Sequence, residues 1–256
     1  TLNGSGSAAA WNNLYGGYSE NPSADAWTGN TLNVISKDNW ANSLNNFKKM
    51  NFKLGAGISS GDRMLYVGYS GNATTFDWND ITVEGASNWA SGSTGTKRVT
   101  LYMGAPLTLN NYSVSGTTYG DYEYGKNSNT TTPTASTVTA SELYFDVNRF
   151  QNADVKASTA GAGSYAGTST LGNTTNHNKY TLDTVVSNYA YAGYTQSEAG
   201  DSTDNEVVIT NGAYTTLYPS VPQIVGGYAK QGKAINNKVT LNGSGSAAAW
   251  NNLYGG

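Results

Sequence analysis

The sequence predicts an all-β chain folded as a parallel β-solenoid, with an irregular excursion around residues 106–140. Three observations lead to this prediction. A short strand template returns along the chain, only 12% of the residues are charged, and residues 1–17 return unchanged as residues 240–256. Self-similarity at a fixed period is typical of repeat architectures, in which stacked coils bury a core that no single coil could bury alone.

The template joins a Gly-Tyr pair to an Asn-x-apolar-x-apolar segment across a gap of variable length. Apolar residues two apart face the same side of a strand, so the second part is expected to be a half-buried strand. The gap is rich in Asn, Ser, Thr, Ala and Gly and is expected to be a turn or loop. Copies begin at Gly17, Gly68, Gly193 and Gly227, with a looser one at Gly163 and Tyr165, and their Asn residues are Asn30, Asn79, Asn205, Asn237 and Asn178.

The low charge content fits parallel stacking. Equivalent residues of stacked coils lie about 4.8 Å apart, and like charges at that spacing repel by about 1 kcal/mol in water and more in the protein. Asn, Thr, Ser and Tyr can instead stack on themselves through hydrogen bonds or ring contacts. The competing architecture is a string of β-sandwich domains, which are also Thr- and Gly-rich with short strands.

The terminal identity predicts a tandem arrangement, with residues 1–239 as one repeat unit of about 24 residues per coil and residues 240–256 as the start of the next identical unit. The alternative is that the match arises from how the chain was cut. The chain begins without Met and is expected to be an internal slice of a longer protein. The expected partner is therefore the chain itself, unit to unit, through covalent continuity or end-to-end association. We expect the junction to involve Trp11, Leu14 and Tyr15 and their repeats Trp250, Leu253 and Tyr254.

The segment 106–140 has few aliphatic residues and many Thr, Asn and Tyr residues. It is expected to leave the coil stack, either as a long solvated loop or as a small β excursion. A functional alternative is an arm that contacts a neighbouring assembly or a host surface, because long loops often carry function.

The sequence offers little for catalysis or metal binding. His177 is the single histidine and there is no cysteine, which excludes the usual zinc sites, and no nucleophile elbow is present. Asp201, Asp204 and Glu206 could supply oxygen ligands to calcium, but a solvated turn fits their spacing better. We therefore expect no cofactor and no metal.

Paired carboxylates for glycoside cleavage are harder to exclude, because a solenoid draws such pairs from coils that are far apart in sequence. Asp121, Glu123, Asp146 and Asp183 are the candidates. The acids are scarce and have no basic cluster beside them, so we expect the protein not to be an enzyme. A net charge of −3 argues against nucleic-acid binding, and no stretch is apolar enough to span a membrane.

Two stretches resemble the passenger domains of bacterial autotransporters. Residues 14–34 (LYGGYSENPSADAWTGNTLNV) resemble the Gly-Gly-Tyr-Ser coils of such passengers, and residues 40–67 resemble a second pattern with Asn46-Phe47, Asn51-Phe52 and Gly61-Asp62. The run 75–85 continues in the same manner, whereas the resemblance is weak over residues 106–187. The family implies a right-handed β-helix displayed outside the cell and anchored by an outer-membrane barrel.

Together these features predict an extracellular structural or adhesive fibre on a bacterial surface, built from stacked units. The first alternative is a discrete autotransporter adhesin that binds a host glycan or protein, through residues 106–140 or a Tyr-rich edge. A remote alternative is a β-helix polysaccharide lyase or hydrolase. Locally, residues 36–50 could also form a helix capped by Asp38, with Trp40, Leu44 and Phe47 on one face, although the resemblance favours strands there.

Overall fold

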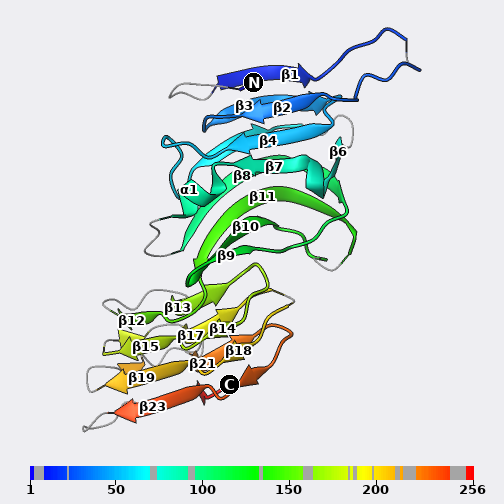
Figure 1. Ribbon diagram of the computed structural model, residues 1–256. Helices are drawn as coiled ribbons and strands as arrows, with labels where there is room; N and C mark the ends of the chain where they lie inside the picture. Colours follow the sequence, from blue (N-terminus) through cyan, green and yellow to red (C-terminus); the bar gives the residue numbers. More distant parts are fainter. Residues whose placement is uncertain are drawn as a thin grey trace. The chain divides into compact units, whose positions relative to one another are not determined.

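The computed structural model describes residues 1–256 apart from 3–8, 22, 70–73, 92–95, 133–134, 158–163, 184, 187–188, 198, 211–213, 216–222 and 243–251. The described chain is nearly all β, with a short helix α1 (Ala86–Ala90) and one 3-10 turn η1 (Trp78–Asp80) (Figure 1). It forms two compact bodies. Body 1 is Thr1–Ser115 with Tyr124–Val147, and body 2 is Gly116–Glu123 with Asn148–Gly256.

Body 1 begins as two stacks of parallel strands. In one stack Leu32 lies beside Met50 and Met50 beside Ile81, so that a column of buried apolar side chains runs through the coils. Its strands are β2 (Thr31–Val34), β4 (Lys49–Lys53) and β7 (Ile81–Glu84). The other stack contains β1 (Ala9–Tyr15), β3 (Asn39–Asn45), β5 (Arg63–Val67) and β8 (Lys97–Asn110), and β6 (Thr74–Asp77) also pairs with β8.

The chain then leaves the parallel stack. β8 pairs antiparallel with β11 (Thr137–Arg149), and the sheet continues to β10 (Tyr122–Ser128) and β9 (Thr117–Tyr119). Val99 lies opposite Phe145, and both side chains are buried. Of the two interpretations of residues 106–140, the β excursion is the one observed.

Body 2 is a regular parallel stack with four short sheets, one for each side of the coil. Successive strands pair in register, with Tyr180 beside Val207 and Val207 beside Val239. The first sheet contains β12 (Asp154–Ala157), β15 (Lys179–Leu182), β19 (Glu206–Thr210) and β23 (Lys238–Asn242). The second contains β13 (Ser164–Ser169), β17 (Tyr189–Thr195), β21 (Gln223–Ala229) and β24 (Asn252–Tyr254). The two smaller sheets contain β14 (Thr175–Asn176), β18 (Ser202–Thr203) and β22 (Ala234–Ile235), and β16 (Val185–Val186) and β20 (Tyr214–Thr215).

The core of body 2 lies between these sheets. Leu182, Ile209 and Ile224 belong to one buried apolar cluster, against which Val239 packs. Because the same positions face inward in each coil, the apolar surface forms a continuous column, as expected for a stack of coils that cannot bury a face alone.

The predicted solenoid is confirmed, and so are the strands favoured within residues 36–50, which form β3 and β4 instead of the alternative helix. Two other expectations are wrong. In the looser template copy, the partners of Gly193 and Tyr194 are Gly167 and Thr168, not Gly163 and Tyr165. The coils of body 2 are also longer than expected, because stacked Asn residues are 27 and 32 residues apart.

Candidate functional site

The N-terminal copy of the repeated segment, residues 1–17, contacts the coil that follows it. Leu2 donates its N–H to the carbonyl of Asn33 at 2.7 Å and accepts from the N–H of Ile35 at 3.0 Å. This bridge places Leu2 opposite Val34, at the edge of the β2 stack. Further along, Leu14 of β1 lies opposite Leu44 of β3.

The C-terminal copy, residues 240–256, contacts the coil that precedes it. Leu241 lies opposite Ile209 in the pairing of β23 with β19. Leu253 lies opposite Ile224 in the pairing of β24 with β21. The two copies of one sequence are therefore paired with different neighbours, one earlier and one later in the chain.

Leu2 and Leu241 are equivalent residues of the two copies, and the two copies are paired along opposite edges at this position. Lys238 donates its N–H to Asn205 O, on the β19 side, at 2.8 Å. Successive residues of a strand direct their N–H groups to opposite edges, so the N–H of Leu241 points away from β19. No strand in the described part of the chain pairs with that edge of β23. It is the edge that Leu2 uses to bind β2.

The predicted junction residues lie on these edges where the structure describes them. Leu14 is half-buried, and Tyr15, Leu253 and Tyr254 are 56%, 37% and 47% exposed. Trp11 lies in β1 with its backbone opposite Ala41, while its side chain and all of Trp250 lie outside the described part. Leu2 and Leu241, which are the clearest pair, were not among the predicted junction residues.

A ladder of Asn side chains runs through body 2. The Nδ2 of Asn178 donates to Oδ1 of Asn205 at 2.8 Å, and that of Asn205 donates to Oδ1 of Asn237 at 2.9 Å. The backbone N–H groups of Asn178 and Asn205 donate to the same oxygens, each at 3.1 Å. Asn178 and Asn205 are buried. These coils of body 2 thus bind one another through amide side chains, which explains the template's Asn at these three positions.

The residue before each ladder position adopts the left-handed backbone conformation. His177, Asp204 and Asn236 have φ of 51°, 53° and 55°. Asn and Asp tolerate this region better than most residues. His177 is exposed, and its place is explained by the corner of the coil, so the single histidine has a conformational role.

Tyrosine rings stack along an adjoining sheet. The centroids of Tyr165 and Tyr194 are 4.6 Å apart, and those of Tyr194 and Tyr228 are 4.9 Å apart with the planes tilted by 18°. Burial raises the pKa of Tyr165 and Tyr194 above the ordinary value for tyrosine. The Tyr-rich edge is therefore stacked on itself.

Charged residues in register alternate in sign. Lys179 lies opposite Glu206, and Glu206 opposite Lys238, whose Nζ is 2.9 Å from its Oε1. A hydrogen bond from Thr240, followed by that from Lys238, lowers the pKa of Glu206. The Thr240 and Lys238 side chains, both in β23, thus attach the coil of β23 to the one before it.

The candidate carboxylates have separate structural partners. Asp146 accepts two bonds from Arg98, at 2.6 and 2.8 Å; Asp183 pairs with Lys156; and Asp121 accepts from Asn152. Glu123 is buried and accepts bonds from Asn148, Ser169, Thr170, Leu171 and Asn173. Each carboxylate is satisfied by neutral donors or by a base, an arrangement that stabilises the coils.

Within the described ranges, no three potential ligands come together to hold a metal ion. Asp201 instead accepts from the N–H of Lys233 at 2.8 Å, in a contact between coils. None of the helices in the same ranges is long and apolar enough to cross a membrane.

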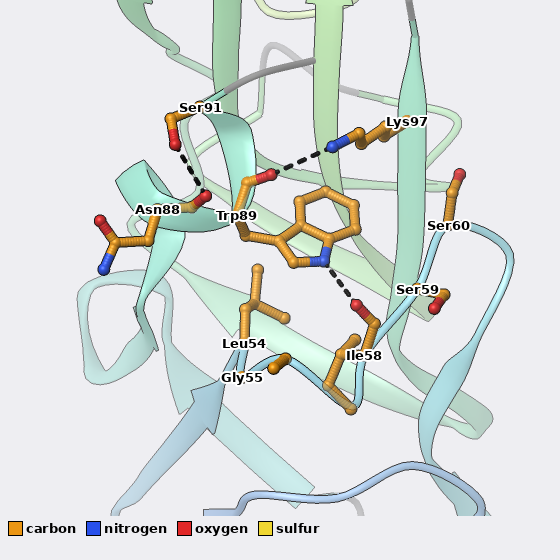
Figure 2. A pocket seen from close by; sticks show the side chains of 10 residues that line it. Leu54, Gly55, Ile58, Ser59, Ser60, Asn88, Trp89, Ser91 and Lys97 are labelled. Carbon is orange, nitrogen blue, oxygen red and sulfur yellow. Dashed lines mark hydrogen bonds between the residues drawn. The ribbon is translucent and has the colours of Figure 1, made fainter.

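Body 1 contains a cavity of about 540 Å³ beside α1. Figure 2 shows Trp89 in the lining of this cavity, with the indole N–H donating to Ile58 O at 2.8 Å and with Lys97 on the other side of the ring. Asn88, Ser59 and Ser60 add polar groups to the lining. The volume falls within the range of small-molecule sites.

Comparison of the chain with protein-family models, with curated proteins and with solved structures finds no match.

Proposed function

We propose that this chain is the repeating unit of an extended structural fibre, in which β-solenoid units stack end to end. One observation carries the proposal. The same segment pairs through β23 and β24 with the preceding coil, and through Leu2 and β1 with the following coil. A segment that has a neighbour on each side is the interior of a stack, so a second unit placed after residue 239 continues both sheets.

The test compares the 256-residue chain with a two-unit chain, in which residues 1–239 precede residues 1–256. Electron microscopy and small-angle scattering are expected to show body 2 of the first unit and body 1 of the second unit as one rigid particle. A flexible link between these two bodies, at the junction of the units, would contradict the proposal.

We place this fibre outside the cell, on a bacterial surface, in keeping with the resemblance to autotransporter passengers. The support is the resemblance and the low charge, and the partner is a further unit of the same chain. Surface labelling of intact cells that produce the full-length protein would test the location.

A discrete adhesin is the second candidate, favoured by the cavity around Trp89. Its size and polar lining suit a small sugar. A glycan array probed with the chain is expected to show a ligand whose binding is lost in Asn88→Ala. Trp27→Leu, at an exposed tryptophan elsewhere in body 1, is the matched control. Glycan binding that is unchanged in Asn88→Ala would exclude this cavity as the binding site.

A further inference from the structure

We infer that Tyr228, Asn237 and β23 form a docking surface for residues 17–34 of a second unit of this chain. In that junction Asn30 extends the Asn ladder and Tyr18 extends the tyrosine stack. This inference rests on the proposed function and gives it a register.

The first register comes from the bridge at the start of the chain. Leu2 lies opposite Val34, and Leu241 is the same residue of the repeat. In a parallel pair, the residue numbers of both strands rise in the same direction. If Leu241 lies opposite Val34 of the next unit, then Asn237, four residues earlier, lies opposite Asn30 of that unit. The template Asn of one unit thereby meets the template Asn of the next.

A second register comes from the other sheet. Val225 lies opposite Tyr254, which is Tyr15 of the repeat. Counting forward through the two glycines that follow places Tyr228 opposite Tyr18 of the next unit. Tyr228 is 37% exposed and Tyr18 is 77% exposed. Both rings have a face available for the stacking seen between Tyr194 and Tyr228.

The two registers agree within a single coil. In body 2 a methyl group on Gly227 would lie 2.3 Å from the side chain of Asn237, so the glycine packs directly on the asparagine. In body 1 a methyl group on Gly17 would lie 2.7 Å from Nδ2 of Asn30. Glycine and asparagine therefore occupy the same relative places in the coil that would follow.

The hydrogen bonds are complementary. Each ladder oxygen accepts from the backbone N–H of the coil before it, beginning with the N–H of Ala153 at 3.0 Å from Asn178 Oδ1. Among the described residues the N–H of Asn237 has no acceptor, and Oδ1 of Asn30 has no donor. The proposed register brings these two groups together.

The corner conformation continues as well. The residue before each ladder position has positive φ, up to Asn236 at 55°. The residue before Asn30 is Gly29, with φ of 79°. Glycine adopts this conformation readily, so the next coil turns at the same point.

The experiment is a double-mutant cycle in the two-unit chain. Asn237→Ala in the first unit and Asn30→Ala in the second are made singly and together, and unfolding is followed in urea. The two changes are expected to be coupled. The equilibrium constant for unfolding of the double variant is expected to be about tenfold smaller than the sum of the two single effects predicts.

The matched control uses the outer positions, Asn30→Ala in the first unit and Asn237→Ala in the second. These variants lose the same contacts within a unit but face no junction, so their effects are expected to add. They also show whether a unit folds with each substitution. Additive effects at the inner pair, in a chain whose two units still meet in a rigid junction, would overturn the proposed register but not the fibre. Units that move independently at the junction would overturn both.

Discussion

Leu2 and Leu241 are the same residue of the repeated segment, yet Leu2 is 5% exposed and Leu241 is 61% exposed. Leu2 is covered by the coil that contains Val34, whereas β23 is the last strand of its sheet in the described part of the chain. The difference in exposure shows how far a following coil buries the leucine at this position.

The first prediction concerns backbone protection at Leu241. In the 256-residue chain its amide faces an unpaired edge and is expected to exchange rapidly with deuterium. In the two-unit chain the corresponding amide between the units is expected to be protected like that of Leu2, which is hydrogen-bonded to Asn33. Hydrogen exchange read by mass spectrometry measures both. Equal, rapid exchange in the two chains would contradict a stacked junction.

The second prediction concerns the middle of the ladder. Asn205→Ala removes the acceptor of the buried Asn178 N–H and two amide donors, so the free energy of unfolding is expected to fall by about 3 kcal/mol. Asn176→Ala is the control. The Oδ1 of Asn176 is buried and has no partner among the described residues, so its loss is expected to be neutral or stabilising. Urea unfolding measures both, and equal costs would argue against the ladder.

The third prediction concerns the glycine that packs on that ladder. In Gly193→Ala the new methyl group would lie 2.4 Å from Nδ2 of Asn205. The free energy of unfolding is expected to fall by about 2–3 kcal/mol, because neither the strand nor the buried amide can move aside. At Gly57 an added methyl group meets nothing within 4 Å, so Gly57→Ala should leave thermal unfolding nearly unchanged. A tolerated Gly193→Ala would mean that the coil spacing is looser than described.

The fourth prediction concerns pH. Lys126 donates to the carbonyl of Trp78 at 2.6 Å, and its burial lowers its pKa to about 8. Between pH 8 and the ordinary lysine pKa of about 10.4 the unfolded chain binds more protons, so stability rises with pH in that window. From pH 8 to 9.5 the free energy of unfolding is expected to rise by about 1–2 kcal/mol.

Lys126→Met is the control for this pH dependence, because it removes the titrating group. Measurements stay below pH 9.5, since tyrosines of the unfolded chain ionise near pH 10. A flat profile for the unmodified chain, or the same rise in Lys126→Met, would show that another group is responsible.

The regular part of the fold could be predicted because stacking puts like residues in like places. Gly193 with Gly227 and Asn205 with Asn237 are template partners in the sequence and neighbours in the structure. The composition also indicated that Asn residues could bind one another in a parallel stack, as Asn205 and Asn237 do. Spacing alone could not show which Asn residues form the ladder.

Other features depend on partners far away in the chain. Residues 36–50 have a helical pattern, but Ala41 and Leu44 pair with β1, and Asp38 turns the chain with φ of 57° instead of capping a helix. Glu123 is satisfied by donors from Asn148 to Asn173, which no local pattern brings to it. Such positions are decided by tertiary contacts.

The Asn ladder also has a direction. Every bond between two ladder residues runs from an N–H group of the earlier coil to the Oδ1 of the later coil. A fibre built on it is therefore polar, with a donor end at Asn237 and an acceptor end at Asn30. Units can join only head to tail, by a heterologous contact, and the two tips of a growing fibre would differ in the rate at which they add the next unit.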